Sequence, residues 1–325
     1  MDVVRWGIIG CGNVTEVKSG PAFQKADGSA LVAVMRRNGE KAKDYALRHG
    51  VPKWTDNADA LIHDPDVDAV YIATPPDSHA MYTKRVAEAG KPVYVEKPMG
   101  RTYSECCDML DVCKQMGVPL FVAYYRRRLP QFVYIKALLE ENAIGNIRAV
   151  TVNLLQAPRP DDYNKENVPW RITPEIAGGG YFYDLASHEL DILDYMLGPI
   201  AEAKGFAANQ TGLYRAEDIV TGAFRFASGV QGAGVWCFTV DAHEERDEIE
   251  IVGEHGRIHF ACFDLEKPVL VVRNGEVEQS RFTMPAHVQQ PLIQTLVDEL
   301  RGPGRCPSTG ESAARTNWVM EQLTL

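Results

Sequence analysis

One residue of this 325-residue chain that could take part in catalysis is a lysine at the end of a short apolar segment. Lys97 stands between Glu96 and Pro98, directly after a stretch with the composition of a buried strand. Proline lacks an N–H and disfavours the helical conformation in the residue before it, so the strand must stop there. An ammonium group held at a fixed place can donate a hydrogen bond to a substrate oxygen and stabilise negative charge on it. Lys97 is therefore a candidate catalytic residue, although most lysines at strand ends are simply solvated.

A second group lies on a predicted helix between a glycine triplet and Gly198. Asp184, His188 and Asp191 are spaced i, i+4 and i+7, so in an α-helix they share one face. An imidazole can take a proton from a substrate hydroxyl, and a neighbouring carboxylate can orient it and support its protonated form. A structural Asp–His hydrogen bond in the core would give the same pattern. Ile192 stands where a zinc protease motif would need its second histidine, so no metal site is predicted.

Two glycines follow the first apolar segment in the order Gly-Cys-Gly-Asn-Val-Thr. Glycines here permit a tight turn and let main-chain N–H groups approach a pyrophosphate at the start of a helix. Thr15 occupies the third small position of the usual pattern and is expected to crowd the contact between helix and strand slightly. A plain turn explains the motif alone equally well, but the alternating strands and helices around it favour a dinucleotide. The predicted contacts are Gly10, Cys11, Gly12, Asn13 and Val14.

The end of the second predicted strand bears on the choice between NADP and NAD. An NAD site usually carries an acid there, which binds the ribose 2′-hydroxyl. This chain has Met35-Arg36-Arg37-Asn38 instead, with no acid before Glu40. A guanidinium group can pair bidentately with a 2′-phosphate, so Arg36 and Arg37 favour NADP over NAD. A solvated turn would carry the same charges.

The elements that must position these residues differ between the two parts of the chain. Short apolar strands alternate with amphipathic helices as far as residue 124, which predicts a parallel sheet covered on both faces. Ligands bind at the carboxyl ends of such strands. From residue 125 a helix is followed by strands with turn signals, among them the hairpin pair Asn274-Gly275, and the last stretch is helical. The strands are predicted at 3–10, 31–35, 69–74, 92–96, 118–125, 147–156 and within 201–284.

These patterns predict an α/β chain of two domains. Residues 1–124 form a dinucleotide-binding Rossmann domain with a parallel sheet. Residues 125–325 form an α+β domain with a mostly antiparallel sheet. The C-terminal helices are expected to pack back on the first domain.

Composition narrows the function classes. The formal net charge of −10 argues against nucleic acid as a partner, because phosphate neutralisation needs clustered lysine and arginine. No run of 18 apolar residues predicts a membrane span. Seven cysteines without a C-x-x-C pair argue against zinc ribbons and thioredoxin-like sites and suggest reduced thiols. A cytoplasmic protein is expected.

Three motifs together resemble the Gfo/Idh/MocA family, which includes glucose–fructose oxidoreductase, inositol dehydrogenase and 1,5-anhydrofructose reductase. They are the G-x-G loop, the strand-end E-K-P, and G-G-G-x-x-x-D-x-x-x-H-x-x-D in the second part of the chain. The resemblance spans essentially the whole chain and implies the two domains described above, with residues 125–325 as an open-sheet domain that binds substrate and mediates oligomerisation. It also implies catalysis by a lysine with an Asp/His pair, roles that fall on Lys97, Asp184 and His188.

The resemblance implies further site residues. The stretch from Thr74 to Ala80 matches the family's loop beside the nicotinamide, and Pro169-Trp170-Arg171 is similar to the segment that closes over cofactor and substrate. Rings and guanidinium groups suit a sugar or polyol, although ordinary packing would also explain Trp170 and Tyr125. The implied cofactor contacts are Thr74, Pro75, His79, Glu96 and Lys97, and the implied substrate contacts are Tyr125, Arg127, Trp170 and Arg171.

We therefore expect an NAD(P)-dependent dehydrogenase or reductase acting on CH–OH groups. It would transfer hydride between nicotinamide and a secondary alcohol or carbonyl of a sugar, inositol or related polyol. Three alternatives stay open: an NAD-dependent glycosidase on the same scaffold, a dihydrodiol-type dehydrogenase and a non-catalytic nucleotide-binding regulator. The resemblance to the family and the broad antiparallel sheet suggest a homodimer or homotetramer. No nucleic-acid or membrane partner is expected.

Overall fold

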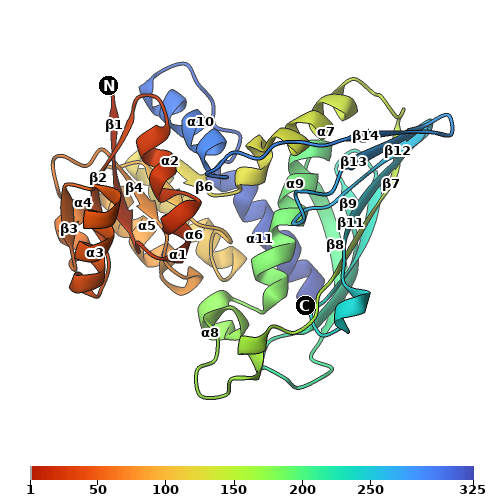
Figure 1. Ribbon diagram of the computed structural model, residues 1–325, viewed down its shortest axis with the longest axis horizontal. Coiled ribbons are helices and arrows are strands. Elements are labelled where there is room, and N and C mark those ends of the chain that lie inside the picture. The colour runs from red at the N-terminus through yellow and green to blue at the C-terminus, as the bar shows by residue number, and fades with distance from the viewer. Residues whose placement is uncertain (1) are drawn as a thin grey trace. The chain divides into compact units, whose positions relative to one another are not determined.

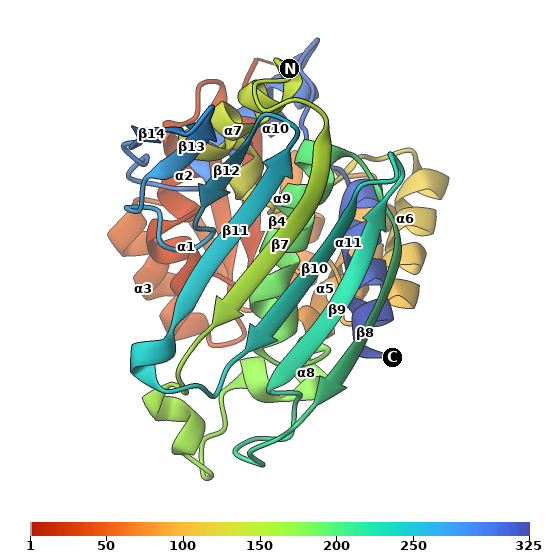
Figure 2. The same ribbon diagram turned by 90° about the vertical axis from the view of Figure 1, so that its right-hand side faces the viewer.

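Two sheets organise the chain, whose residues 2–325 are described by a computed structural model. The first unit contains the chain up to Arg128 together with Pro285–Ala314. The second unit contains Leu129–Met284 and Arg315–Leu325. Figures 1 and 2 show the elements of each unit. The predicted roles of residues 1–124 and 125–325 in binding stay predictions.

The first unit is built on a six-stranded parallel sheet in the order β3-β2-β1-β4-β5-β6. The strand order reverses between β1 and β4, and such a switch point is where open α/β sheets bind ligands. Strands β1, β4, β5 and β6 are almost wholly buried and apolar, as the sequence predicts. The short, exposed β3 was not predicted. The strands are β1 (Val4–Ile9), β2 (Ser29–Met35), β3 (Lys53–Thr55), β4 (Ala69–Ile72), β5 (Val93–Val95) and β6 (Leu120–Val122).

The helices of the first unit begin and end for local reasons. Thr102 caps α6 by accepting a hydrogen bond from the Glu105 N–H, and Gly117 ends that helix in the left-handed region at φ 67°. Gly50 ends α3 in the same way at φ 64°. The helices are α1 (Asn13–Val17), α2 (Gly20–Lys25), α3 (Gly39–His49), α4 (Ala58–Ile62), α5 (His79–Glu88) and α6 (Tyr103–Met116).

A segment from near the end of the sequence completes the first unit. Helix α10 (Gln290–Arg301) lies against α2, as Figure 1 shows. Thr309 forms an isolated antiparallel bridge with Phe121 of β6, and the Ser308 hydroxyl donates to the Val122 carbonyl at 2.7 Å.

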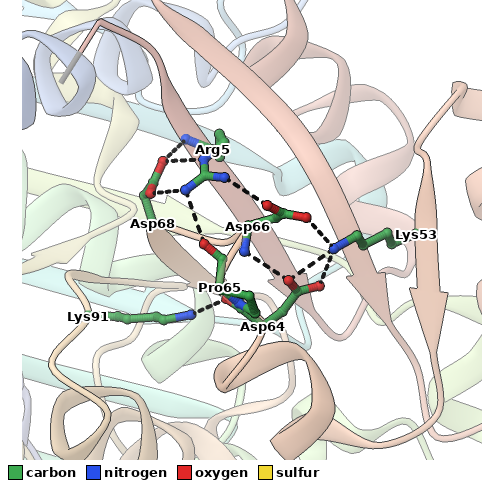
Figure 3. A network of polar contacts seen from close by, with 7 residues as sticks. All are labelled: Arg5, Lys53, Asp64, Pro65, Asp66, Asp68 and Lys91. Carbon is green, nitrogen blue, oxygen red and sulfur yellow. Dashed lines mark hydrogen bonds and ion pairs between the residues drawn. The ribbon is translucent and has the colours of Figure 1, made fainter.

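An ionic network occupies the amino-terminal edge of the first sheet (Figure 3). Arg5 of β1 binds Asp68 through Nε at 2.9 Å and Nη2 at 2.8 Å, and it reaches Asp66 through Nη1 at 3.1 Å. Lys53 of β3 binds Asp64 at 2.8 Å and Asp66 at 2.7 Å. These side chains join the starts of β1, β3 and β4 at the edge opposite to the predicted cofactor site.

The second unit is built on an eight-stranded sheet in the order β14-β13-β12-β11-β7-β10-β9-β8. All pairs are antiparallel except β7 with β10, and Figure 2 shows the central strands side by side. Asn274 and Gly275 turn the last hairpin at φ 52° and 82°, as predicted. The strands are β7 (Ile147–Leu155), β8 (Ile200–Ala208), β9 (Ile219–Phe226), β10 (Gln231–Cys237), β11 (Arg246–Gly253), β12 (Gly256–Phe260), β13 (Val269–Arg273) and β14 (Glu276–Ser280).

Helix α9 (Ser187–Leu197) covers one face of this sheet, behind β7 and β10 in Figure 2. The Trp236 indole of β10 donates to the buried Glu189 carboxylate of α9 at 2.7 Å. Arg315 binds Asp194 of α9 through two hydrogen bonds of 2.7 Å. The remaining helices are α7 (Pro130–Glu140), α8 (Pro174–Ala177) and α11 (Gly310–Thr324). Within residues 2–325 no helix combines the length and apolar character that crossing a bilayer requires.

Candidate functional site

The predicted phosphate loop follows β1. Gly10 has φ 91°, and a Cβ there would lie 2.7 Å from Thr74 Cγ2, so only glycine fits. At Gly12 a Cβ would meet only the Gly10 carbonyl oxygen, at 3.7 Å, which leaves open space above the main chain. In the part of the chain described, no protein group accepts from the N–H groups of Gly12, Asn13 and Val14. Open space beside free N–H donors fits a dinucleotide pyrophosphate.

Thr15 adapts to its position better than expected. Its side chain is fully buried, and its hydroxyl donates to the Gly12 carbonyl at 2.8 Å. Its own carbonyl accepts from the Tyr45 hydroxyl at 2.9 Å. The hydroxyl therefore has a partner inside the loop, and this hydrogen bond accommodates the side chain that was expected to crowd the contact.

Arg36 lies beside the phosphate loop, because its Nη1 donates to the Cys11 carbonyl at 3.3 Å. The Cys11 side chain is buried, and burial raises the pKa of its thiol to about 11, so the residue can contribute through its main chain and not as a thiolate. Arg37, the next residue, is exposed. Two guanidinium groups at the end of β2 are compatible with a 2′-phosphate.

Lys97 lies two residues after the end of β5, and the bond between Lys97 and Pro98 is cis. Behind it lies Glu96, which is buried and accepts from the Tyr71 hydroxyl at 2.5 Å and from Gln289 Nε2 at 2.7 Å. Its second oxygen accepts from the Lys97 N–H at 3.1 Å. These bonds assign Glu96 to the support of the strand end, where the sequence analysis expected a cofactor contact. Sequence reasoning missed Gln289.

His79 is also turned inward. The residue is fully buried, and its Nε2 lies 2.8 Å from the Thr74 carbonyl oxygen. Its Nδ1 lies 3.1 Å from the carbonyl oxygen of Pro98 and 3.2 Å from that of Met99. The expected cofactor contact of His79 is therefore indirect, through the loops that it joins. Thr74 and Pro75 remain partly exposed at the end of β4.

Arg127 corrects one expectation. The residue is only 2% exposed, and its Nη1 donates to the Pro307 carbonyl and, at 3.0 Å, to the Ser312 hydroxyl. It anchors the segment that returns to the first unit and offers no surface to a substrate. Tyr125 is 7% exposed and packs under the Arg126 guanidinium, so it also belongs mainly to the core.

The second unit carries the predicted acid and imidazole. Asp184 lies in a π-helical segment, η5 (Phe182–Ala186), which precedes α9 and was not predicted. Such segments are rare and occur often at functional sites. Hydrogen bonds in a π-helix span five residues, so the backbone between Asp184 and His188 is not regular α-helix, and their pairing stays a prediction. His188 is 4% exposed, and its ring lies 6.2 Å from that of Phe263.

Asp184 has a partner that the sequence analysis did not assign. Its Oδ2 accepts from Arg171 Nε at 2.9 Å, and the Arg171 guanidinium lies 4.4 Å from the centre of the Trp170 ring. The Asp184 side chain is 12% exposed and that of Arg171 is 42% exposed. Three predicted site residues therefore form one contact group. Asp191 is buried and accepts from the Thr316 hydroxyl at 3.5 Å.

The glycine triplet before the π-helical segment allows close packing at its start. A Cβ at Gly180 would lie 2.8 Å from both the Ala216 Cβ and the Glu217 carbonyl oxygen. The Gly180 N–H donates to Glu217 Oε1 at 2.8 Å, so a carboxylate supports the start of the helix. Burial raises the pKa of Glu217, an effect that the Gly180 N–H opposes. Nothing local in the sequence indicates this role for Glu217.

A metal has no evident place among these groups. Residues 2–325 contain no cluster of three or more His, Cys, Asp or Glu side chains that could hold one. The chemistry available is hydrogen-bond donation by Lys97, proton exchange at His188, and the ion pair of Asp184 with Arg171.

Comparisons with known proteins agree with this picture. A family model described as "oxidoreductase family, NAD-binding Rossmann fold" matches residues 4–124. A second model, the "GFO/IDH/MocA C-terminal domain", matches residues 132–259. The two models together cover most of the chain.

Individual relatives extend over the same length. A protein named as an oxidoreductase from Formosa agariphila is 42% identical over 98% of this chain and 97% of its own. A 1,5-anhydro-D-fructose reductase from Ensifer adhaerens is 28% identical over 94% of this chain and 91% of its own. A solved levoglucosan dehydrogenase in complex with NADH and levoglucosan has a TM-score of 0.85 at 24% identity, covering 98% of this chain and 96% of that one. This last likeness concerns the fold alone.

Proposed function

Because the chain belongs to the Gfo/Idh/MocA family of NAD-binding oxidoreductases, we propose that it transfers hydride between a nicotinamide dinucleotide and a secondary alcohol or carbonyl of a sugar or related polyol. The observation that carries most weight is the built support behind Lys97. Glu96, Tyr71 and Gln289 form a buried network that bonds to the strand end through the Lys97 N–H and the Tyr94 hydroxyl. A solvated lysine would not need such support.

The cofactor that we propose is NADP, in preference to NAD. When bound, the nicotinamide supplies or receives the hydride. The N–H groups of Gly12, Asn13 and Val14 would bind the pyrophosphate, and Arg36 with Arg37 would bind the 2′-phosphate. The solved levoglucosan dehydrogenase is described with NADH, so the arginines are the support for NADP here.

In this proposal Lys97 and His188 act on the same substrate oxygen. Lys97 donates a hydrogen bond to the reacting oxygen and stabilises negative charge on it, and His188 exchanges the hydroxyl proton. Asp184 keeps Arg171 in place through the 2.9 Å bond to Nε, and Arg171 with Trp170 contacts the substrate. Relatives named as a 1,5-anhydro-D-fructose reductase and a levoglucosan dehydrogenase support a sugar-like substrate.

We also propose a homo-oligomer whose contacts use the outer face of the second sheet. Phe206 on the edge strand β8 is 81% exposed, and small residues such as Ala223 and Ala233 leave the neighbouring strands flat and exposed. Light scattering on a sizing column would test this, and a monomer at micromolar concentration would refute it.

The experiment for the activity is a panel of sugars and polyols with NADP⁺ and NAD⁺, followed by absorbance of the reduced cofactor. Lys97→Met and His188→Asn should each lower kcat by about 10²- to 10⁴-fold while cofactor binding is retained. Lys84→Met, on the exposed side of α5, is the matched control. Near-normal turnover in both site variants would refute the mechanism, and release of sugar without net cofactor reduction would indicate a glycosidase.

A further inference from the structure

Two arginines of the second unit stack on aromatic rings in the neighbourhood of Asp184. The Arg159 guanidinium, in the loop after β7, lies 4.2 Å from the centre of the Tyr181 ring. The Arg171 guanidinium lies 4.4 Å from the centre of the Trp170 ring and uses Nε on Asp184. Stacking fixes a guanidinium plane and leaves the N–H groups at its edge available.

These donor edges have no acceptor within the part of the chain described. No protein group accepts from the Arg159 guanidinium, and Nη1 and Nη2 of Arg171 are likewise unused. Other arginines of the same unit behave differently. Arg215, for example, forms an ion pair with Glu175, and Arg225 forms one with Glu202. Arg159 is therefore unusual in lacking a carboxylate while being held in place.

The carboxylate of Asp162, three residues after Arg159, binds groups other than the Arg159 guanidinium. Asp162 is 2% exposed, its Oδ1 accepts from the Tyr181 hydroxyl at 2.6 Å, and its Oδ2 accepts from the Arg159 main-chain N–H at 2.7 Å. Asp162 thus fixes both the ring under the guanidinium and the backbone that carries it. The loop is organised to hold a positive charge in place without neutralising it through a direct ion pair.

Arg159 and Arg171 act on the same region. The Arg159 guanidinium contacts the ring of Tyr181, and Arg171 binds the carboxylate of Asp184. Tyr181 and Asp184 are three residues apart in one short helical segment, so both cations lie against the same segment. Both arginines are also partly exposed, so a ligand can reach them.

The chemistry of two such groups is selective. A neutral polyol is served by single donors, whereas the planar fork of arginine matches the two oxygens of a carboxylate or phosphate and gains charge assistance. We propose that the substrate carries an anionic group, a carboxylate or a phosphate, and that Arg159 and Arg171 bind it. This inference deepens the proposed function and rests on it for the identity of the reacting alcohol. Arg171 can bind the anion through Nη1 and Nη2 while Nε stays on Asp184.

The test is a binding measurement that does not depend on turnover. Calorimetry on the full chain saturated with NADPH or NADH would compare D-glucitol, D-gluconate and D-glucitol 6-phosphate, which a reduced cofactor cannot convert. We expect at least one of the two anions to bind about tenfold or more tightly than D-glucitol. Arg159→Gln should remove about ten- to a hundredfold of that affinity and leave D-glucitol binding within about twofold, since hydrogen bonds to charged groups are the strong ones. The two anions distinguish a sugar acid from a sugar phosphate.

Arg215→Gln is the matched control, because it removes an exposed arginine of the same unit that already has a carboxylate partner. Equal affinity for the three ligands, no detectable anion binding, or anion binding that survives Arg159→Gln would each overturn the inference. Circular dichroism would confirm that both variants fold. Turnover measured in parallel separates the two hypotheses. Equal oxidation of neutral and anionic polyols would uphold the proposed function and defeat the inference. Anion binding through Arg159 without any turnover would uphold the inference and defeat the proposed function.

Discussion

Nε2 of His79 lies 2.8 Å from the carbonyl oxygen of Thr74. The opposite ring nitrogen faces the carbonyl oxygens of Pro98 and Met99, so one buried ring joins the loop after β4 to the turn after Lys97. Both loops carry residues of the candidate site. We therefore expect His79 to be a positioning residue that acts on the candidate site through the main chain.

Replacing His79 should loosen both loops together. His79→Ala removes the ring and its N–H from between these buried carbonyl groups, and the free energy of unfolding should fall by about 1–3 kcal/mol. We expect the KM for the dinucleotide to rise and kcat to fall, with partial rescue in His79→Asn, which can still donate to one side. Steady-state kinetics and urea denaturation measure this. The exposed His243→Ala is the control, and unchanged kinetics in His79→Ala would argue for a purely structural ring.

Gln289 provides a second test of the support behind Lys97. Its Nε2 donates to Glu96 and its Oε1 accepts from the Tyr94 hydroxyl at 3.0 Å. Gln289→Leu leaves a buried carboxylate short of a donor and should cost about 2–4 kcal/mol of stability and lower kcat. Gln289→Glu places a second carboxylate there, so its stability deficit should grow as pH rises and both acids ionise. Urea denaturation and steady-state kinetics measure these effects. Gln290→Leu, one residue further on, should change neither the free energy of unfolding nor kcat.

The phosphate loop allows a contrast between two glycines. Gly10→Ala forces a Cβ to 2.7 Å from Thr74 at a positive φ, so it should lower stability by about 1–3 kcal/mol. Gly12→Ala meets open space and should leave the melting temperature unchanged, yet weaken dinucleotide binding about tenfold or more by blocking close approach. Thermal melts and fluorescence titration with NADPH measure the two effects. Normal NADPH binding in a folded Gly12→Ala variant would remove the loop from the cofactor site.

Cofactor preference should depend on Arg36 and Arg37. In Arg36→Asp, and separately in Arg37→Asp, the ratio of kcat/KM for NADP⁺ to that for NAD⁺ should fall by about tenfold to a hundredfold, because a charge-assisted pair is replaced by repulsion. Initial rates with each cofactor give the ratio directly. A preference that neither variant alters would show that the arginines form only a solvated turn.

The ionic network of Figure 3 makes stability depend on pH. The hydrogen bond from Lys53 lowers the pKa of Asp64 and also that of Asp66. Carboxylates with lowered folded-state pKa contribute stability that is present above the unfolded value and lost as pH falls through the folded value, here below about pH 4. Lys53→Met should therefore unfold at lower urea than the unmodified protein at pH 7, and the difference should narrow as pH falls below about 4. A difference that stays constant as the pH falls, or that Lys84→Met reproduces, would contradict this origin.

Local features of the fold were readable from the sequence because their causes are local. The apolar runs of β1 and β4, the glycines that end α3 and α6, and the hairpin at Asn274 each depend on a few adjacent residues. The same holds for the placement of Lys97 at a strand end.

The remaining features depend on partners far away in the sequence. Glu96 and Gln289 are 193 positions apart, and no local pattern connects them. Arg127 was expected at a substrate because the family resemblance places it in the pocket, yet its guanidinium binds a carbonyl 180 positions later in the chain. The π-helical turn at Asp184 has no sequence rule, so its pairing with Arg171 was also missed.

The late return of Pro285–Ala314 to the first unit bears on biosynthesis. A ribosome releases β1 to β6 long before α10. Glu96 therefore lacks its hydrogen bond from Gln289 while the whole second sheet is being made. We expect a fragment ending at residue 128 to be trapped in a chaperone-dependent state. Supplying residues 285–314 on a separate peptide would be the natural way to complement it.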